Sequence, residues 1–233
     1  MVDKYSRPSL PLPVARQLRQ EAGFGCAKCG HPYIEYHHIV PWSEEQHYRP
    51  DDMVALCGNC HVLIARLGKD RQYEVKNNPK NIREGLLRGA LVYDKRDLTF
   101  LVGGNYYVNT PIILQYKDIP VVACSLQDGQ AKLTLNLFDK SGNSIFQVFE
   151  NEVVFRPDAI WDFEYGHNWV TVRHGPRQIA LQINFRECEA VIRGKIWLGG
   201  NEVRLDPQST NLPGNNTISG CHIVGSRVGI SVH

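Results

Sequence analysis

The sequence predicts an α+β protein, in which a small module of helices and a short strand precedes an all-β antiparallel domain of sandwich or barrel-like form. The change in hydrophobic periodicity is the main observation behind this division. Up to about residue 96, apolar residues recur every three or four positions, as in helices. Beyond that point they alternate with polar residues, as in strands with one buried face. A chain of 233 residues accommodates one large domain or two small ones.

Local signals place the elements of the N-terminal module, which we assign to residues 14–96. Residues 1–13 are polar and rich in proline, which predicts a flexible arm. Residues 33–40 are rich in β-branched and aromatic side chains and predict a short strand. Apolar residues at helical spacing predict helices over three further segments: 13–23, 53–68 and 80–92.

Short alternating segments separated by turn residues define the second domain, residues 97–233. Strict alternation of apolar residues predicts strands over 131–138, 178–185 and 227–232. Gly, Asn and Asp form turn signals at 127–130, 140–143 and 199–201. This pattern is typical of antiparallel sandwiches and barrels.

The net charge also differs between the two predicted parts of the chain. The chain has a formal charge of +2, with a net +4 over residues 1–96 and a net −2 over residues 97–233. A basic first part favours a nucleic-acid partner there, although a solvated charged face is the simpler alternative. The net charge of the β domain argues against broad binding to phosphates, but it does not fix how that charge is distributed.

Nothing in the sequence predicts a membrane partner. The longest apolar runs are too short to span a bilayer. The N-terminus carries charges and prolines where a signal peptide needs an apolar core. We therefore expect a cytoplasmic location.

Cysteine spacing predicts a structural zinc site. The first 60 residues contain two C-x2-C pairs, formed by Cys26, Cys29, Cys57 and Cys60. Two such pairs in a chain without a secretory signal fit a tetrahedral four-cysteine zinc site. The alternative is four ordinary thiols or redox pairs. The remaining cysteines are expected to fill core space as small apolar residues: Cys124, Cys188 and Cys221.

Three histidines suggest a second metal site. His37 and His38 are neighbours on the predicted strand, so they point to opposite faces and need different tasks. His61 follows the fourth cysteine directly, on a predicted helix. A metal held at the strand–helix junction by His37 and His61 is chemically sensible, with His38 beside it as a metal-free imidazole that titrates near neutral pH. His31 and His47 lie in polar loops and are expected to bind nothing.

The segment from about residue 16 to residue 66 resembles the HNH endonucleases. The resemblance rests on the motifs CAKC, EYHHIVP, DDM and LCGNCH taken together. It implies a ββα-metal fold and the metal-dependent hydrolysis of DNA, with double-stranded DNA as the expected partner. It does not extend to residues 97–233.

The resemblance also implies roles for single residues. His37 and His61 match ligands of the catalytic divalent metal, for which Mg²⁺, Mn²⁺, Ni²⁺ and Zn²⁺ all remain candidates. His38 matches the general base that activates water. Asp52 occupies the catalytic-motif position that is usually asparagine, and is expected either to support the active-site loop or to act as a carboxylate ligand. Ala65 stands where some members supply a further ligand.

Further residues in and near the motif are assigned roles, some of them with an alternative. The four cysteines match the structural zinc of a subset of the family. Glu35 either orients a histidine or faces solvent. The basic residues that follow the metal helix are candidates for phosphate contacts, and are equally expected as a solvated helix end: Arg66, Lys69 and Arg71.

The most direct functional hypothesis is a metal-dependent HNH endonuclease with a β-rich recognition, sensing or assembly domain, in restriction or host defence. The alternative is a non-catalytic zinc protein that binds nucleic acid or a protein partner. Cleavage of both strands would usually need a homodimer, whereas nicking needs none. The β domain leaves a small ligand or a protein partner open. Its tryptophans could line a pocket, but core or sheet-face positions are the commoner role: Trp161, Trp169 and Trp197.

Overall fold

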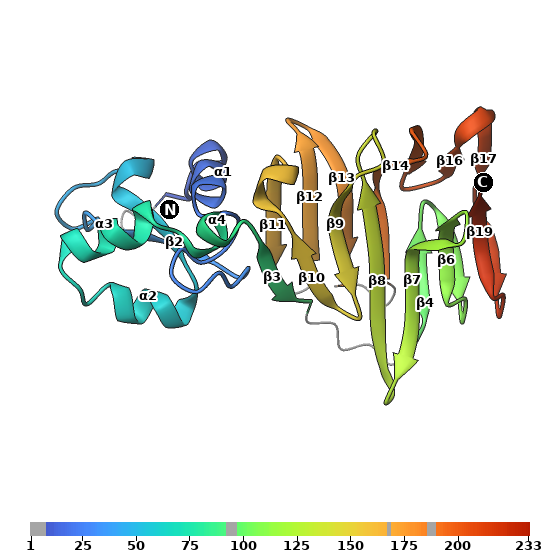
Figure 1. The fold of residues 1–233 in the computed structure, drawn as a ribbon, viewed down its shortest axis with the longest axis horizontal. Coiled ribbons are helices and arrows are strands. Elements are labelled where there is room, and N and C mark those ends of the chain that lie inside the picture. Colours follow the sequence, from blue (N-terminus) through green and yellow to red (C-terminus); the bar gives the residue numbers. More distant parts are fainter. Residues whose placement is uncertain (1–7, 92–96, 167–168, 186–189) are drawn as a thin grey trace, which may run out of the picture. The chain divides into compact units, whose positions relative to one another are not determined.

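A computed structural model describes residues 8–91, 97–166, 169–185 and 190–233 (Figure 1). The chain forms two compact units, one ending at Glu84 and the other beginning at Gly85. The division therefore falls earlier than the predicted boundary, which adjoins residues 92–96, outside the described part of the chain. Strand pairing explains the early division, because residues 87–90 form an edge strand of the second unit.

The first unit is a small α+β fold. Its elements are α1 (Leu12–Glu21), β1 (Glu35–His38), the 3₁₀ helix η1 (Pro50–Asp52), β2 (Met53–Leu56), α2 (Gly58–Ile64), α3 (Lys69–Asn77) and α4 (Lys80–Glu84). Strands β1 and β2 pair antiparallel, with His37 opposite Val54. Because α2 follows β2 after a single residue, these three elements form a ββα unit.

Two helix predictions are corrected. The segment 53–68 begins with strand β2, whose four side chains are all buried. A short, continuously apolar run does not distinguish a buried strand from a helix, and pairing with β1 decides the outcome here. The helix predicted over 80–92 ends at Glu84, because Gly85 takes a left-handed φ of +65° that stops the helix.

Helix α3 was not predicted, because its sequence is mainly charged and amide residues and lacks a clear apolar stripe. Gly68 precedes it and Asp70 lies in its first turn, which are the local signals for its start. It turns Gln72 into the interior, and Tyr73 and Val75 pack against the core of the unit.

That core is small. It gathers the buried residues Cys26, Ala27, Ile39, Val54, Leu56 and Ile64, with Ile34, Cys57, Cys60, Tyr73 and Val75 packed against them. Of the four cysteines of the predicted zinc site, Cys26 belongs to this cluster, and Cys57 and Cys60 pack against it. Further buried apolar side chains of the first unit are those of Ala15, Leu18, Ala22, Phe24, Met53 and Ala55.

The second unit consists almost entirely of strands and short turns. Its strands are β3 (Leu87–Ala90), β4 (Thr99–Val102), β5 (Asn105–Val108), β6 (Ile112–Tyr116), β7 (Ile119–Gln127), β8 (Gln130–Phe138), β9 (Ser144–Phe149), β10 (Glu152–Phe155), β11 (Asp162–Gly166), β12 (Trp169–Gly175), β13 (Gln178–Asn184), β14 (Ala190–Leu198), β15 (Asn201–Leu205), β16 (Thr210–Leu212), β17 (Asn216–Ile218), β18 (His222–Val224) and β19 (Val228–Val232). Two 3₁₀ helices interrupt them: η2 (Pro157–Ala159) and η3 (Pro213–Asn215).

These strands form two sheets. One has the order β19-β6-β7-β8-β9-β10-β3, and the other follows β11-β12-β13-β14-β15-β16-β17, with β4, β5 and β18 joined to it through β14. Most pairs are antiparallel, as predicted. Three pairs are parallel, namely β14 with β4, β18 with β5 and β19 with β6. The α+β class with a β-rich second part is confirmed.

The two sheets share an apolar interior. Side chains along β8 alternate between buried and half-buried, which confirms the strand predicted over 131–138. Phe163 of β11 contacts Phe146 and Phe155 of the other sheet, with ring centroids 5.9 and 4.8 Å apart. Among the single cysteines, Cys124 is buried and Cys221 is half-buried, while Cys188 lies outside the described residues. None of the described helices is long and apolar enough to cross a bilayer.

We expect Phe163→Ala to destabilise the second unit by about 3–5 kcal/mol, because it removes a fully buried ring that touches both sheets. Guanidinium unfolding followed by tryptophan fluorescence measures this change. Phe149→Ala is the matched control, since that ring is 66% exposed and its loss should change the free energy of unfolding by less than about 0.5 kcal/mol. Equal stability of the two variants would contradict the sandwich interior described above.

Candidate zinc site and metal-dependent active site

The four predicted cysteines converge. The sulfur atoms of Cys26, Cys29, Cys57 and Cys60 all lie within 4.8 Å of one another. The Cys29 and Cys57 sulfurs are 3.6 Å apart. Zinc–sulfur bonds of about 2.3 Å in a tetrahedron place sulfurs about 3.8 Å apart. The cluster therefore fits a structural zinc ion.

Two chain segments bring these thiols together. The first pair lies in a knuckle that is docked on β2, where the Ala27 amide donates to the Ala55 carbonyl at 2.9 Å. The second pair flanks the start of α2, with Cys57 just before it and Cys60 in its first turn. Burial and the neighbouring Cys57 thiol raise the pKa of the Cys60 thiol well above its ordinary value. A bound cation reverses that penalty, because it stabilises thiolates that would otherwise repel one another.

Helix α4 closes the knuckle from the other side. The buried side chain of Asn81 donates to the carbonyls of Gly23 and Gly30, both at 3.1 Å. Gly30 has a φ of +82°, and a Cβ there would lie 2.4 Å from the Asn81 side-chain oxygen. Glycine at position 30 thus permits both the turn and the close approach of Asn81.

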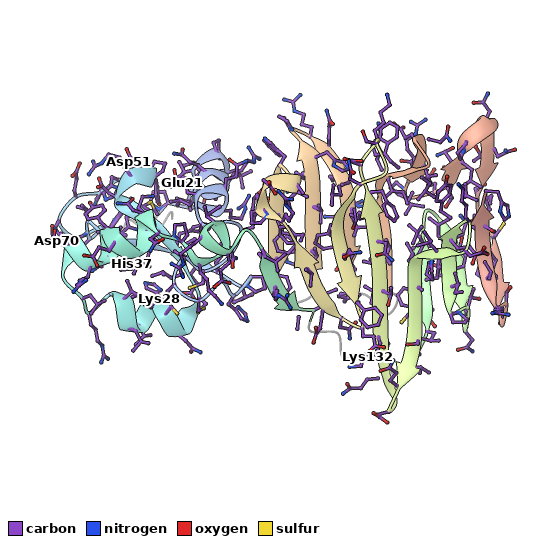
Figure 2. The ribbon with its side chains drawn as sticks, viewed as in Figure 1. Glu21, Lys28, His37, Asp51, Asp70 and Lys132 are labelled. Carbon is purple, nitrogen blue, oxygen red and sulfur yellow. The ribbon has the colours of Figure 1, made fainter. Side chains whose placement is uncertain are left out.

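His37 and His61 meet at the strand–helix junction, with ring centroids 4.8 Å apart. Figure 2 labels His37 among the side chains of the first unit. The Nδ1 of His61 donates to the Glu35 carboxylate at 2.9 Å, which leaves its Nε2 as the lone-pair atom. A carboxylate in this position fixes the tautomer of a ligating histidine.

The ring of His37 is hydrogen-bonded through Nε2, whereas that of His61 is hydrogen-bonded through Nδ1. Gln72 donates its Nε2 to the Leu67 carbonyl at 2.7 Å, so its oxygen accepts from the Nε2 of His37 at 2.8 Å. The Nδ1 of His37 therefore carries the lone pair. Burial lowers the pKa of His37 below its ordinary value, which favours the neutral, metal-binding form.

These two histidines offer two ligand atoms. Within the described part of the chain, the four-cysteine cluster is the one place where three or more cysteine, histidine or acidic ligand groups converge. Ala65, one turn after His61, adds none. A divalent metal bound here would complete its coordination with water or with oxygens of the substrate, as in open catalytic sites.

His38 lies on the other face of β1, as expected for the neighbour of His37. Its Nε2 donates to the His47 carbonyl at 2.9 Å, which fixes the orientation of the ring. His47 is buried, and its ring is held between the Val40 carbonyl and the Arg49 amide at 3.0 and 3.2 Å. The loop position of His47 gave no sign of its burial, and the expectation that it binds no ligand stays a prediction.

Asp52 forms a structural junction. Its carboxylate accepts from the Tyr73 hydroxyl and from the Arg49 Nε, both at 2.7 Å. These hydrogen bonds lower the pKa of Asp52 and keep it an acceptor. Its backbone carbonyl accepts from Ile39 at 2.8 Å, which ties η1 to the end of β1. This arrangement agrees with loop support, and Asp52 does not join His37 and His61 in a three-ligand cluster.

The three candidate phosphate contacts are exposed. Lys69 pairs with Glu44 and Arg71 with Glu74, each at 2.6 Å. Such exposed pairs are weak, so a phosphate can replace either carboxylate. The nucleic-acid role of Arg66, Lys69 and Arg71 remains a prediction.

We expect the purified protein to hold about one zinc ion per chain, and the double variant Cys29→Ser with Cys60→Ser to lose it, because each half of the site then lacks a thiolate. Elemental analysis of the dialysed proteins measures the zinc content. Cys221→Ser should retain zinc, since that thiol lies in the second unit. Retention of a full equivalent by the double variant would rule out the four-cysteine site.

Comparison with known proteins agrees with this geometry. No curated protein and no solved structure shows significant similarity to the chain. The family model of the HNH endonuclease matches residues 25–65, which include both cysteine pairs as well as His37, His38 and His61. The first unit of this chain therefore contains an HNH module with a four-cysteine cluster that fits a structural zinc ion.

Proposed function

We propose that the first unit hydrolyses phosphodiester bonds of DNA with a divalent metal at His37 and His61 and with His38 as general base. The observation that carries this proposal is the fixed orientation of three imidazoles. Glu35, Gln72 and the His47 carbonyl each hydrogen-bond one ring nitrogen of His61, His37 and His38, respectively, and so hold the three rings in defined orientations.

His37 Nδ1 and His61 Nε2 are the atoms that would hold the metal. A divalent metal supplies Lewis-acid stabilisation of the negative charge that builds on the phosphate. Because His37 is kept neutral by burial, its lone pair stays available at neutral pH. Glu35 holds the His61 ring in place through its hydrogen bond to Nδ1.

His38 supplies the proton acceptor. Its Nδ1 takes a proton from the water that attacks phosphorus, and the bond to the leaving 3′ oxygen breaks. The Nε2–H group of His38 stays hydrogen-bonded to the His47 carbonyl throughout the reaction, and this hydrogen bond stabilises the imidazolium that forms. Solvent returns a proton to the leaving oxygen, so the products are a 3′-hydroxyl and a 5′-phosphate.

We expect the full chain to nick supercoiled plasmid when Mg²⁺, Mn²⁺, Ni²⁺ or Zn²⁺ is added, and His38→Ala to reduce the rate by about 10²–10⁴-fold through loss of the general base. Gel analysis of plasmid cleavage over time measures both. His38→Ala must retain its structural zinc, which separates lost chemistry from lost folding.

His233→Ala serves as the matched histidine control, because this exposed imidazole lies in the second unit and should leave the rate unchanged. A rate for His38→Ala equal to that of the wild type would contradict its role as base. Plasmid binding without cleavage under any of the four metals would instead favour the non-catalytic nucleic-acid-binding alternative.

Glu35→Ala should weaken binding of the divalent metal by about 10–100-fold, because His61 loses the partner that fixes its tautomer. Calorimetric titration of the zinc-loaded protein with Mn²⁺ or Ni²⁺ measures the affinity. Glu74→Ala is the control, since that carboxylate pairs with Arg71 on the surface of α3. Equal affinities of the two variants for the divalent metal would contradict a role of Glu35 in metal binding.

A further inference from the structure

The second unit carries an ordered polar surface that the nuclease chemistry does not use. On the outer face of strands β11 to β14, cross-strand partners form a row of Glu164, Thr171, Gln182 and Arg193. The next row on the same face, two residues along each strand, contains Gly166, Trp169, Asn184 and Val191. Their neighbours along each strand point inward, where Val170, Val172, Leu181 and Ile183 are buried.

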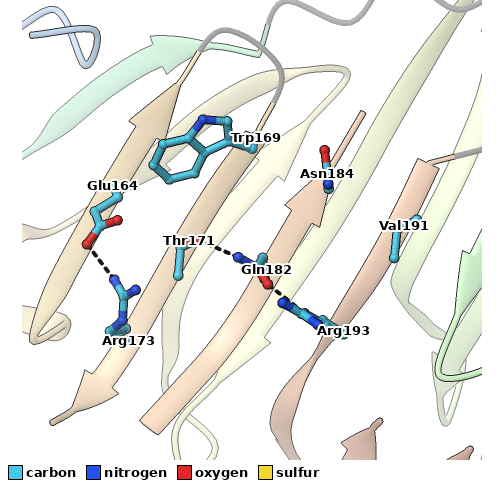
Figure 3. Close-up of a pocket in the computed structure, with 8 residues that line it drawn as sticks. All are labelled: Glu164, Trp169, Thr171, Arg173, Gln182, Asn184, Val191 and Arg193. Atoms are coloured by element: carbon cyan, nitrogen blue, oxygen red, sulfur yellow. Dashed lines mark hydrogen bonds and ion pairs between the residues drawn. The ribbon is translucent and has the colours of Figure 1, made fainter. Parts of the chain in front are cut away.

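Apart from Gly166, the residues of these rows line a cavity of about 430 Å³, together with Arg173 (Figure 3). Its walls combine an indole, two carboxamides, a hydroxyl, two guanidinium groups, the carboxylate of Glu164 and the apolar side chain of Val191. A Cβ at Gly166 would lie 2.1 Å from the Trp169 indole nitrogen, so the ring lies over Gly166 and its position depends on glycine there.

Hydrogen bonds hold the lining residues in place. The Nε of Arg193 donates to the Gln182 side-chain oxygen at 2.5 Å, and the Gln182 Nε2 donates to the Thr171 hydroxyl at 3.3 Å. Arg173 pairs with Glu164 at 2.8 Å. The polar groups are thus oriented before any ligand binds, which reduces the entropic cost of binding.

A second cavity, of about 450 Å³, shares Arg193 with the first. The cations along it are Arg177, Arg193, Lys195 and Arg204, against the single carboxylate of Asp206. Glu202 pairs with Lys195 at 2.8 Å and with Arg204 at 3.3 Å, but it does not line the cavity. A locally positive surface therefore exists in a unit, residues 85–233, whose formal net charge is zero.

We propose that the outer face of β11 to β14 binds a nucleotide, with its base against Trp169 and Asn184 and its phosphate at Arg193 and the neighbouring cations. An indole face stacks on any planar base, and carboxamides match the donors and acceptors along a base edge. Guanidinium groups bind phosphate oxygens in a bidentate manner. The adjoining aromatic–amide and cationic cavities match the two chemically distinct parts of a nucleotide. This site does not depend on the nuclease chemistry proposed for the first unit.

Binding tests use the full chain without added divalent metal, so that cleavage does not interfere. The probes are the four 2′-deoxynucleoside 5′-monophosphates, measured by calorimetry, and a fluorescein-labelled single-stranded 12-mer, measured by fluorescence anisotropy. Trp169→Ala should weaken binding at least about tenfold with little change in salt dependence, because it removes stacking. Arg193→Ala should weaken binding and lower the salt slope by about one, because it removes a phosphate contact.

Trp197→Ala is the matched control, since Trp197 is on β14 and lines neither cavity. Trp169→Phe should restore most of the affinity, which separates stacking from loss of structure. Binding of the monophosphates indicates a site for free nucleotides, whereas binding of the 12-mer alone indicates a nucleotide within a strand. Failure of every probe to bind at millimolar concentration, or equal binding by Trp169→Ala, Arg193→Ala and the wild type, would overturn the proposal.

Discussion

The convergence of four cysteine sulfurs is the constraint on which the first unit depends. The two cysteine pairs lie in segments that are far apart in the sequence, and they join the knuckle to the start of α2. His61 directly follows Cys60, so the position of the cluster also sets the position of this histidine relative to β1. A structural site thereby determines the geometry of the histidine pair beside it.

Each imidazole at the junction owes its orientation to a different part of the chain. Glu35 comes from β1, Gln72 from α3, and the His47 carbonyl from the loop before η1. The partners are of three kinds: a carboxylate, an amide and a backbone carbonyl. His37 and His61 therefore use different ring nitrogens for these hydrogen bonds, Nε2 and Nδ1. His37 and His38 are adjacent on one strand and point to opposite faces, so they can serve different chemical tasks.

Spacing in the sequence was enough to predict the cysteine cluster and the His37–His61 pair, because both depend on short motifs with demanding ligand geometry. Alternation likewise predicted β8 and β13. The sequence did not predict α3, whose polar composition hides the buried Gln72 and the contact of Tyr73 with Asp52. It could not predict the cavity at Trp169 either, since the rows that line it depend on the register between strands, and alternation alone does not specify register.

The family match ends at residue 65, but the folded unit does not. Tyr73 of α3 donates to Asp52, and Asn81 of α4 donates to the carbonyls of Gly23 and Gly30. Helices α3 and α4 therefore contribute contacts that hold the matched segment in its fold. Without them, Gly23 and Gly30 would lose a buried donor, which carries a free-energy cost. If such modules pass between proteins by recombination, the inherited piece must therefore extend through α4, and a breakpoint at the end of the recognisable motif would transfer an incomplete fold.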